Sequence, residues 1–212
     1  MGTIPCPNRS ERVMSDTERC PWAGPQDIYI AYHDEEWGVP RADDRWLLEK
    51  LALEGFQSGL SWITVLNKRA RFRQVFDNFD AEKVARYDEK KIQSLLEDAG
   101  IIRHRGKIEA TINNSQAYLR LRERVSLSAF LWDFVDGIPQ QNAVKSMKDI
   151  PGQTPTSTAM AKALKKEGFR FCGPTTVYAF MQSAGMVNDH LVSCHRHAPC
   201  VELANKFKAP RA

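Results

Sequence analysis

One glutamate occupies a position that a helical pattern predicts to be buried. Glu54 follows Leu47 and Leu51 by seven and three residues, so in a helix it continues their apolar stripe. Many aromatic residues surround it in the sequence, namely Trp22, Tyr29, Tyr32, Trp37, Trp46, Phe56 and Trp62. A buried carboxylate among aromatic rings can bind a flat ligand that is cationic or donates hydrogen bonds. The alternative is a glutamate at a helix end whose carboxylate reaches water beside core tryptophans.

A second group of residues has the chemistry of metal ligands. The five cysteines are an odd number in a chain too large to need disulfides, which favours metal binding or simple burial. The spacing of His190 and Cys194 would place both on one face of a helical turn, where they could bind one tetrahedral ion. Cys20 and His33 would have to come from the other end of the chain, so that the ion joins the two ends. Rival ligands in the same segment are His195, His197 and Cys200.

Two stretches that contain glycine are candidates for anion binding. RFCGPTTV precedes a predicted helix, and a helix start presents free N–H groups and the positive end of the helix dipole. IIRHRGKI has three basic residues around its glycine. In the alternative interpretation, both are tight turns between helices with solvated charges. The residues concerned are Gly173, Pro174, Thr175 and Thr176 in the first stretch, and Arg103, Arg105 and Lys107 in the second.

Helical patterns dominate the elements that must position these groups. No alternating strand pattern competes with them, so we expect an all-α domain of about eight to ten helices. Glycines at positions 100, 168 and 185 are expected to end helices, the first as a left-handed C-cap. The expected helices start at Asp43 or Asp44 and run to Phe56, then cover 61–76, 81–87 after Asp80, 89–100, 106–121, 128–135, 157–168 and 174–185.

The composition limits the class of protein. With 42% hydrophobic and 26% charged residues, the chain is typical of a soluble globular protein. No apolar run approaches the roughly 18 residues of a membrane span, and the N-terminus has no signal-peptide pattern. We therefore expect a cytoplasmic protein without a membrane partner. Residues 1–18 are predicted to be a disordered extension, 19–200 a single domain with two helical lobes, and 201–212 a flexible tail.

Five stretches and one further cysteine, in order from about Arg19 to Cys194, resemble the Tag-type DNA-3-methyladenine glycosylases of the helix-hairpin-helix superfamily. They are RCPWA, YIAYHDEEWGVP, LEGFQSGLSWITVLNKR, DAGIIRHRGKIEA and ALKKEGFRFCGPTTVYAFMQSAGMVNDH, with a cysteine at position 194. The resemblance implies the helix-hairpin-helix glycosylase fold and hydrolysis of the N-glycosidic bond of 3-methyladenine in alkylated DNA. It also implies a structural zinc ion on Cys20, His33, His190 and Cys194.

The resemblance further assigns roles to single residues. It implies a base pocket with Glu54 as the catalytic carboxylate, with Tyr29, Tyr32 and Trp62 around the base and Trp22 and Trp37 more loosely placed. RFCGPTTV matches the DNA-binding hairpin. The implied partners are double-stranded DNA with a flipped-out 3-methyladenine and the free base as product, and the protein is expected to be monomeric.

Two positions depart from the wider superfamily and bear on mechanism. Many members have a catalytic aspartate two residues before a histidine, where VNDH has Asn188, with Asp189 next to it. An amide cannot stabilise an oxocarbenium ion as a carboxylate does, so catalysis would depend on the weak bond of a cationic lesion. Thr175 occupies the position of the lysine that forms a Schiff base in bifunctional members. We therefore predict a monofunctional hydrolase that leaves an abasic site.

Two rival functions remain at this point. One is the same fold with another alkylated or deaminated base as its substrate. The other is a catalytically silent helical module, held together by zinc, that binds DNA or a toxin-like ligand without cutting a glycosidic bond. Glu54, Trp62 and Tyr32 argue against the silent module, because a pure DNA binder needs the hairpin but not the pocket.

Overall fold

The computed structural model describes residues 17–210, which form a mostly helical fold. The predicted extension 1–18 therefore lies almost wholly outside the described residues. The α-helices are α1 (Asp27–Glu35), α2 (Asp44–Gln57), α3 (Trp62–Leu66), α4 (Arg69–Val75), α5 (Ala81–Val84), α6 (Glu89–Glu97), α7 (Arg105–Leu121), α8 (Leu127–Trp132), α9 (Pro155–Lys166), α10 (Pro174–Ser183) and α11 (His197–Lys206). The expectation of an all-α domain needs one correction, because β1 (Gln140–Gln141) pairs in parallel with β2 (Val187–Asn188).

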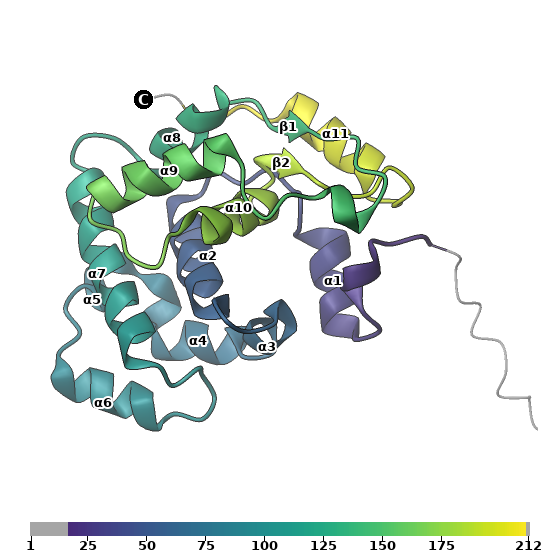
Figure 1. Cartoon of the computed structure of the whole chain (residues 1–212). Coiled ribbons are helices and arrows are strands. Elements are labelled where there is room, and N and C mark those ends of the chain that lie inside the picture. Colours follow the sequence, from purple (N-terminus) through teal and green to yellow (C-terminus); the bar gives the residue numbers. More distant parts are fainter. Residues whose placement is uncertain (1–16, 211–212) are drawn as a thin grey trace, which may run out of the picture.

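Helix α2 is the central element. Its start is fixed by Asp43, whose side chain accepts a hydrogen bond from the backbone N–H of Trp46 at 2.8 Å. Asp44 instead accepts from the N–H groups of Leu127 and Ser128, which holds the start of α8. Every residue of α2 from Leu47 to Phe56 is buried. Figure 1 shows α2 and α10 between α5–α7 on one side and α1 on the other.

Two apolar cores share α2. The first combines its N-terminal half with residues of α7, α8, α9 and α10, and it contains the fully buried Trp132. The second combines its C-terminal half with α1, α3, α4 and α6, and it contains the stacked rings of Phe72 and Phe76. Both cores include α2. Side chains near the C-terminal end of this helix can therefore reach the space between the two cores.

The helix predicted over 61–76 is two helices, α3 and α4, with a break at Asn67 and Lys68. A straight helix would separate Trp62 from Phe76 by about 21 Å. The break instead lets Trp62 pack against Tyr32 while Phe76 packs against Phe56. No sequence pattern marks this change of direction.

Two other predicted helices end earlier than expected, and a third ends at its glycine. Residues 81–87 are helical only over α5, and α6 ends at Glu97. Gly100 is not a left-handed cap, because the chain leaves the helix in an extended conformation at Asp98, whose carboxylate accepts from the N–H of Gly100 at 2.7 Å. Gly168 does end α9 in the left-handed region, with φ of 92°.

Two helices extend beyond the elements predicted from the sequence. Helix α1 was not predicted, and α11 continues to Lys206, where the sequence predicts a flexible tail from residue 201. The reason is burial, because Cys200 and Ala204 turn inward from α11, which packs against β2. Within the described residues, no helix has the length and apolar character needed to cross a bilayer.

Gly185 allows the turn after α10 to approach the chain at Pro40. Its φ is 67°, and a Cβ atom would lie 2.3 Å from the Pro40 nitrogen. An alanine in the left-handed region costs about 1–2 kcal/mol. Gly185→Ala should therefore lower the free energy of unfolding by more than this, because its Cβ atom would also clash with Pro40. Gly59→Ala is the matched control, because its φ is 80° with open space around it. Equal losses in denaturant melts of the two variants would contradict the close approach.

Candidate functional site

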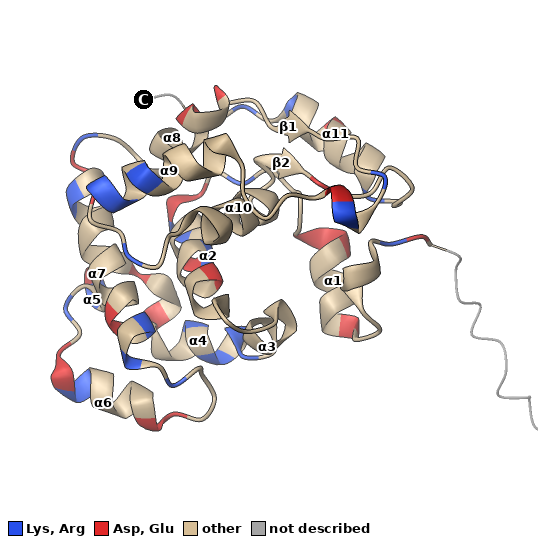
Figure 2. Ribbon diagram, in the orientation of Figure 1, with Lys and Arg blue, Asp and Glu red and all other residues tan. Residues whose placement is uncertain are grey.

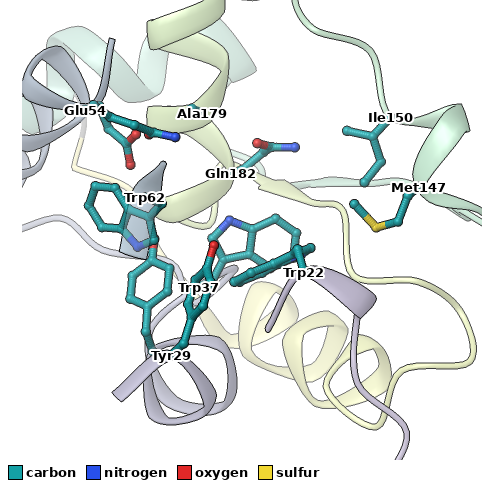
Figure 3. A pocket seen from close by; sticks show the side chains of 11 residues that line it. Trp22, Tyr29, Trp37, Glu54, Trp62, Met147, Ile150, Ala179 and Gln182 are labelled. Atoms are coloured by element: carbon teal, nitrogen blue, oxygen red, sulfur yellow. The ribbon is translucent and has the colours of Figure 1, made fainter. Parts of the chain in front are cut away.

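A cavity of about 210 Å³ opens between the two cores. Its walls come from α1, α2, α3, α10 and the turns at 21–23 and 147–149. Figure 3 shows the aromatic rings of Trp22, Tyr29 and Trp37 on one side, with Glu54 and Gln182 across from them. The volume lies below the roughly 300–1,000 Å³ of sites for drug-sized molecules, so it suits one flat ring system. The lining residues are Trp22, Tyr29, Tyr32, Trp37, Glu54, Gln57, Trp62, Met147, Ile150, Ala179 and Gln182.

The aromatic wall is held by contacts among its own members. The ring centroid of Trp22 lies 4.9 Å from that of Trp37 and 5.3 Å from that of Tyr29. Tyr32 and Trp62 lie 5.2 Å apart at the deeper end. The indole N–H of Trp62 is buried and has no hydrogen-bond partner among the described residues. A ligand with an acceptor atom would therefore satisfy a donor that the protein leaves unpaired.

Glu54 is the buried carboxylate of this cavity, as the helical pattern predicts. Its exposed fraction is 4%, and burial raises its pKa. Two neighbours lower that pKa again, the ammonium group of Lys50 and the side chain of Ser183. The Nζ atom of Lys50 lies 3.6 Å from Oε1 of Glu54, one helical turn away. Lys50 is not among the site residues predicted from the sequence, although a residue four positions before a buried carboxylate shares its face of the helix.

The four predicted metal ligands come together in one buried cluster. The ligand atoms of Cys20, His33, His190 and Cys194 all lie within 4.8 Å of one another. Cys194 Sγ lies 3.5 Å from both His33 Nε2 and His190 Nδ1. Contacts with the Cys20 thiol and with the two histidines lower the pKa of Cys194. Two sulfur and two imidazole donors at this separation could hold a tetrahedral metal ion.

The outer nitrogen atoms of both histidines are also engaged. His33 Nδ1 lies 2.7 Å from Asp34 Oδ1, and His190 Nε2 lies 3.0 Å from the carbonyl oxygen of Trp37. A carboxylate or carbonyl in this position orients a metal-binding histidine. A Cβ atom on Gly38 would lie 3.0 Å from the His190 ring, and its φ is 79°, so the turn requires glycine. The donor set and its surroundings therefore fit a structural metal ion.

The cluster and the cavity share aromatic residues. The Trp37 ring packs on His190 with centroids 4.6 Å apart, and Trp22 packs on His33 at 5.1 Å. Both tryptophans line the cavity. The cluster therefore fixes one cavity wall as well as joining the two ends of the chain.

The local structure around the cluster differs from the expectation in one respect. His190 and Cys194 lie in turns rather than on a helix, and the turn brings the cysteine back to the histidine. The rival ligands stay outside the cluster. His195 contacts Asp34 and the carbonyl oxygen of Glu18, and His197 contacts that of Asn142. Cys200 is buried, but its sulfur does not join the cluster.

Helices α9 and α10 form a hairpin with a groove of about 630 Å³ beside the turn that joins them. Gly173 caps α10 without a side chain, and a Cβ atom there would meet open space. Pro174 is the first helical residue, and Thr175 is exposed. The exposed basic residues beside the groove are Lys162 and Lys165 of α9 and Arg170 of the turn (Figure 2). The helix start and these cations could bind an anion.

The basic residues of the second glycine stretch do not all face solvent. Lys107 is buried, and its ammonium group donates to the carbonyl oxygens of Phe56 and Ser58 at 3.0 and 2.6 Å. Lys107 therefore stabilises the end of α2, whereas the sequence predicts that its side chain contacts an anion. Arg105 is paired with Glu89 at 2.8 Å, and Arg103 is exposed.

Asn188 and Asp189 are both buried and engaged in hydrogen bonds. The amide nitrogen of Asn188 donates to Gln141 and to the carbonyl oxygen of His197. The Asp189 carboxylate accepts from Tyr178, Gln182 and Asn142, each at 2.7 Å. Since Gln182 lines the cavity, Asp189 supports the wall from behind.

Comparison with known proteins gives a consistent result. The sequence model of a family described as methyladenine glycosylase matches residues 22–197. The chain is 51% identical to the DNA-3-methyladenine glycosylase 1 of Escherichia coli over 84% of this chain and 95% of that protein. Identity with the DNA-3-methyladenine glycosylase of Haemophilus influenzae is 49%, over 87% of this chain and 98% of the relative.

Solved structures agree with the sequence relatives. A crystal structure of a 3-methyladenine DNA glycosylase I matches with a TM-score of 0.84 and 50% identity, over 85% of this chain and all of the other. The enzyme of Staphylococcus aureus, solved to explain its recognition of 3-methyladenine, matches with a TM-score of 0.82 and 37% identity, over 84% and 96% of the chains.

The inward position of Lys107 can be tested by stability alone. Lys107→Met should lower the free energy of unfolding by about 2 kcal/mol, because the carbonyl groups of Phe56 and Ser58 lose a charged donor and the first of them is buried. Lys165→Met changes an exposed lysine in the same way and should leave stability nearly unchanged. Chemical denaturation of both variants measures the difference. A Lys107→Met variant as stable as the parent would mean that this ammonium group faces water.

Proposed function

The chain belongs to the methyladenine glycosylase family, and from this premise we propose that it excises 3-methyladenine from alkylated DNA. The observation that carries the proposal is the cavity itself, in which one buried carboxylate faces aromatic rings in a volume suited to a single base. A base in a duplex must be flipped out of the stack to reach such a cavity.

In this proposal, the base is held by stacking and by hydrogen bonds at its edge. Tyr29, Tyr32 and Trp62 contact the ring, while Trp22 and Trp37 close the outer wall. Glu54 acts as the catalytic carboxylate and accepts hydrogen bonds from the adenine edge. The unpaired indole N–H of Trp62 supports this role, because a ring nitrogen of the base could accept from it.

The proposed reaction is hydrolysis without a covalent intermediate. Water adds to C1′ of the sugar, the bond to N9 breaks with its electron pair going to the base, and a proton is released. The cationic lesion leaves as a neutral base, which makes it a good leaving group. The engaged side chains of Asn188 and Asp189 are consistent with a reaction that depends on the leaving group. Thr175, at the position of the lysine that forms a Schiff base in bifunctional members, supports a monofunctional enzyme that leaves an abasic site.

The α9–α10 hairpin is the proposed DNA contact, in the role of a helix-hairpin-helix element. The N–H groups at Gly173, Thr175 and Thr176, next to Pro174, would bind a phosphate, because the groove beside them is open and has a basic rim. Arg103 would add a further contact to the backbone of double-stranded DNA. Arg105 would contribute less to this contact, because its guanidinium group is already paired with Glu89. We propose that a monomer suffices, since one chain provides both cavity and hairpin.

We also propose that Cys20, His33, His190 and Cys194 hold a structural zinc ion. Bound zinc would join segments that lie 170 residues apart in the sequence, from Cys20 to His190. The two histidines would keep their outer hydrogen bonds to Asp34 and to the carbonyl group of Trp37.

Metal analysis should find about one zinc ion per chain. Cys194→Ser should lose the ion and lower the melting temperature, because the ends of the chain are then no longer joined. It should also weaken binding of free 3-methyladenine, since Trp22 and Trp37 pack on the cluster. Cys200→Ser is the matched control, a buried cysteine outside the cluster, and should keep its zinc. A zinc-free protein with unchanged melting behaviour would exclude the structural role.

Incubation with methylated duplex DNA should release 3-methyladenine, identified by chromatography, and little hypoxanthine from deaminated DNA. Glu54→Gln should slow excision and weaken binding of the free base by roughly 10- to 100-fold, because a charged acceptor is lost. Glu49→Gln should retain activity, since that carboxylate pairs with Arg73 outside the cavity. The product strand should stay intact, and borohydride should trap no protein–DNA adduct. Release of another base as the main product would replace the proposed substrate.

A further inference from the structure

Lys50 is a buried cation next to a cavity proposed to accept a cationic base. Its exposed fraction is 3%, and burial lowers its pKa to about 8. It does not line the cavity, but it lies directly behind three residues that do, Tyr32, Glu54 and Trp62. A buried ammonium group is costly unless its surroundings compensate the charge, so these contacts require an explanation.

Each contact of Lys50 involves a residue of the proposed base site. The Nζ atom donates to the phenol oxygen of Tyr32 at 2.8 Å and lies 3.6 Å from Oε1 of Glu54. It also lies 3.8 Å from the centroid of the Trp62 ring and 4.4 Å from that of Tyr32. One ammonium group thus orders side chains from α1, α2 and α3.

The other charged groups around Lys50 already have partners. Glu36, which directly follows α1, forms a bidentate pair with Arg69 of α4, with N···O distances of 2.6 and 2.7 Å. Glu49 on α2 pairs with Arg73 of α4 at 2.8 Å. On α10, the Ser183 side chain lowers the pKa of Glu54, and the uncharged Ala179 and Gln182 line the same cavity. Lys50 and Glu54 are therefore left as counter-ions for each other.

We propose that Lys50 is a positioning residue, which keeps Glu54 ionised and fixes it, with Tyr32 and Trp62, in the arrangement that receives the base. The benefit of this role for base binding rests on the proposed function. The ionisation of Glu54, in contrast, can be measured in the protein without base or DNA. Without Lys50, burial would act on Glu54 with only the Ser183 side chain to oppose it. The carboxyl group would then take up a proton at higher pH and cease to be a charged acceptor.

Lys50→Met tests this role through its pH dependence. The affinity for free 3-methyladenine should fall on the acid side as Glu54 is protonated, and in the variant this fall should move to higher pH by about 1–3 pH units. The titration of the free base is common to all variants, so the difference between profiles reports on the protein. Lys50→Arg should restore the original position of the fall. Lys68→Met, which removes a lysine bound only to a carbonyl oxygen outside the cavity, should leave it unchanged.

The carboxyl ¹³C chemical shift of Glu54 measures ionisation without any activity. It should be that of a carboxylate at pH 7 in the parent protein and should change at higher pH in Lys50→Met than in the parent. A folded Lys50→Met variant with an unshifted titration would overturn the proposal. If Lys50→Met does not fold, the parent protein decides: a Glu54 that is protonated at pH 7 would overturn the proposal. A parent protein that shows the expected titration but excises no base would overturn the proposed function and leave the role of Lys50 standing.

Discussion

The burial of two opposite charges one turn apart on α2 is the constraint on which the site depends. Lys50 and Glu54 are both buried, with exposed fractions of 3% and 4%, so the polar contacts that compensate their charges must come from the protein. The phenol of Tyr32 provides one such contact, and this requires α1 to lie in a fixed position against α2. Besides the contacts of Tyr32 with Trp62 and of Glu36 with Arg69, α1 is held at a point outside these helices.

The Cys/His cluster provides that fixation. It joins His33 of α1 to the turn that follows β2, and the Trp37 carbonyl group accepts from the same cluster. The consequence is a line of contacts that runs from the cluster through the aromatic wall to the buried ion pair. One group of residues therefore both holds the segments around Cys20 and Cys194 together and sets the shape of the cavity.

The sequence predicts the parts of this arrangement that depend on periodicity or donor chemistry. The stripe through Leu47, Leu51 and Glu54 predicts α2 and the buried carboxylate, and the Cys and His residues indicate a shared site. Direction changes such as the break at Asn67 leave no such pattern, because they follow from packing between distant elements. The partner of Glu54 and the inward turn of Lys107 were missed for a related reason, since a lysine is normally solvated and only tertiary contacts show otherwise.

The position of the cluster residues in the sequence also sets an order of assembly. Helices α2, α7, α8, α9 and α10 provide the first core and are all synthesised before His190. Helix α1 precedes these helices in the chain, yet its anchoring partners His190 and Cys194 follow α10. The cluster that holds the aromatic wall can therefore form only after the helices of the first core have been synthesised. A nascent chain can thus build its scaffold before it presents a surface able to hold a nucleobase.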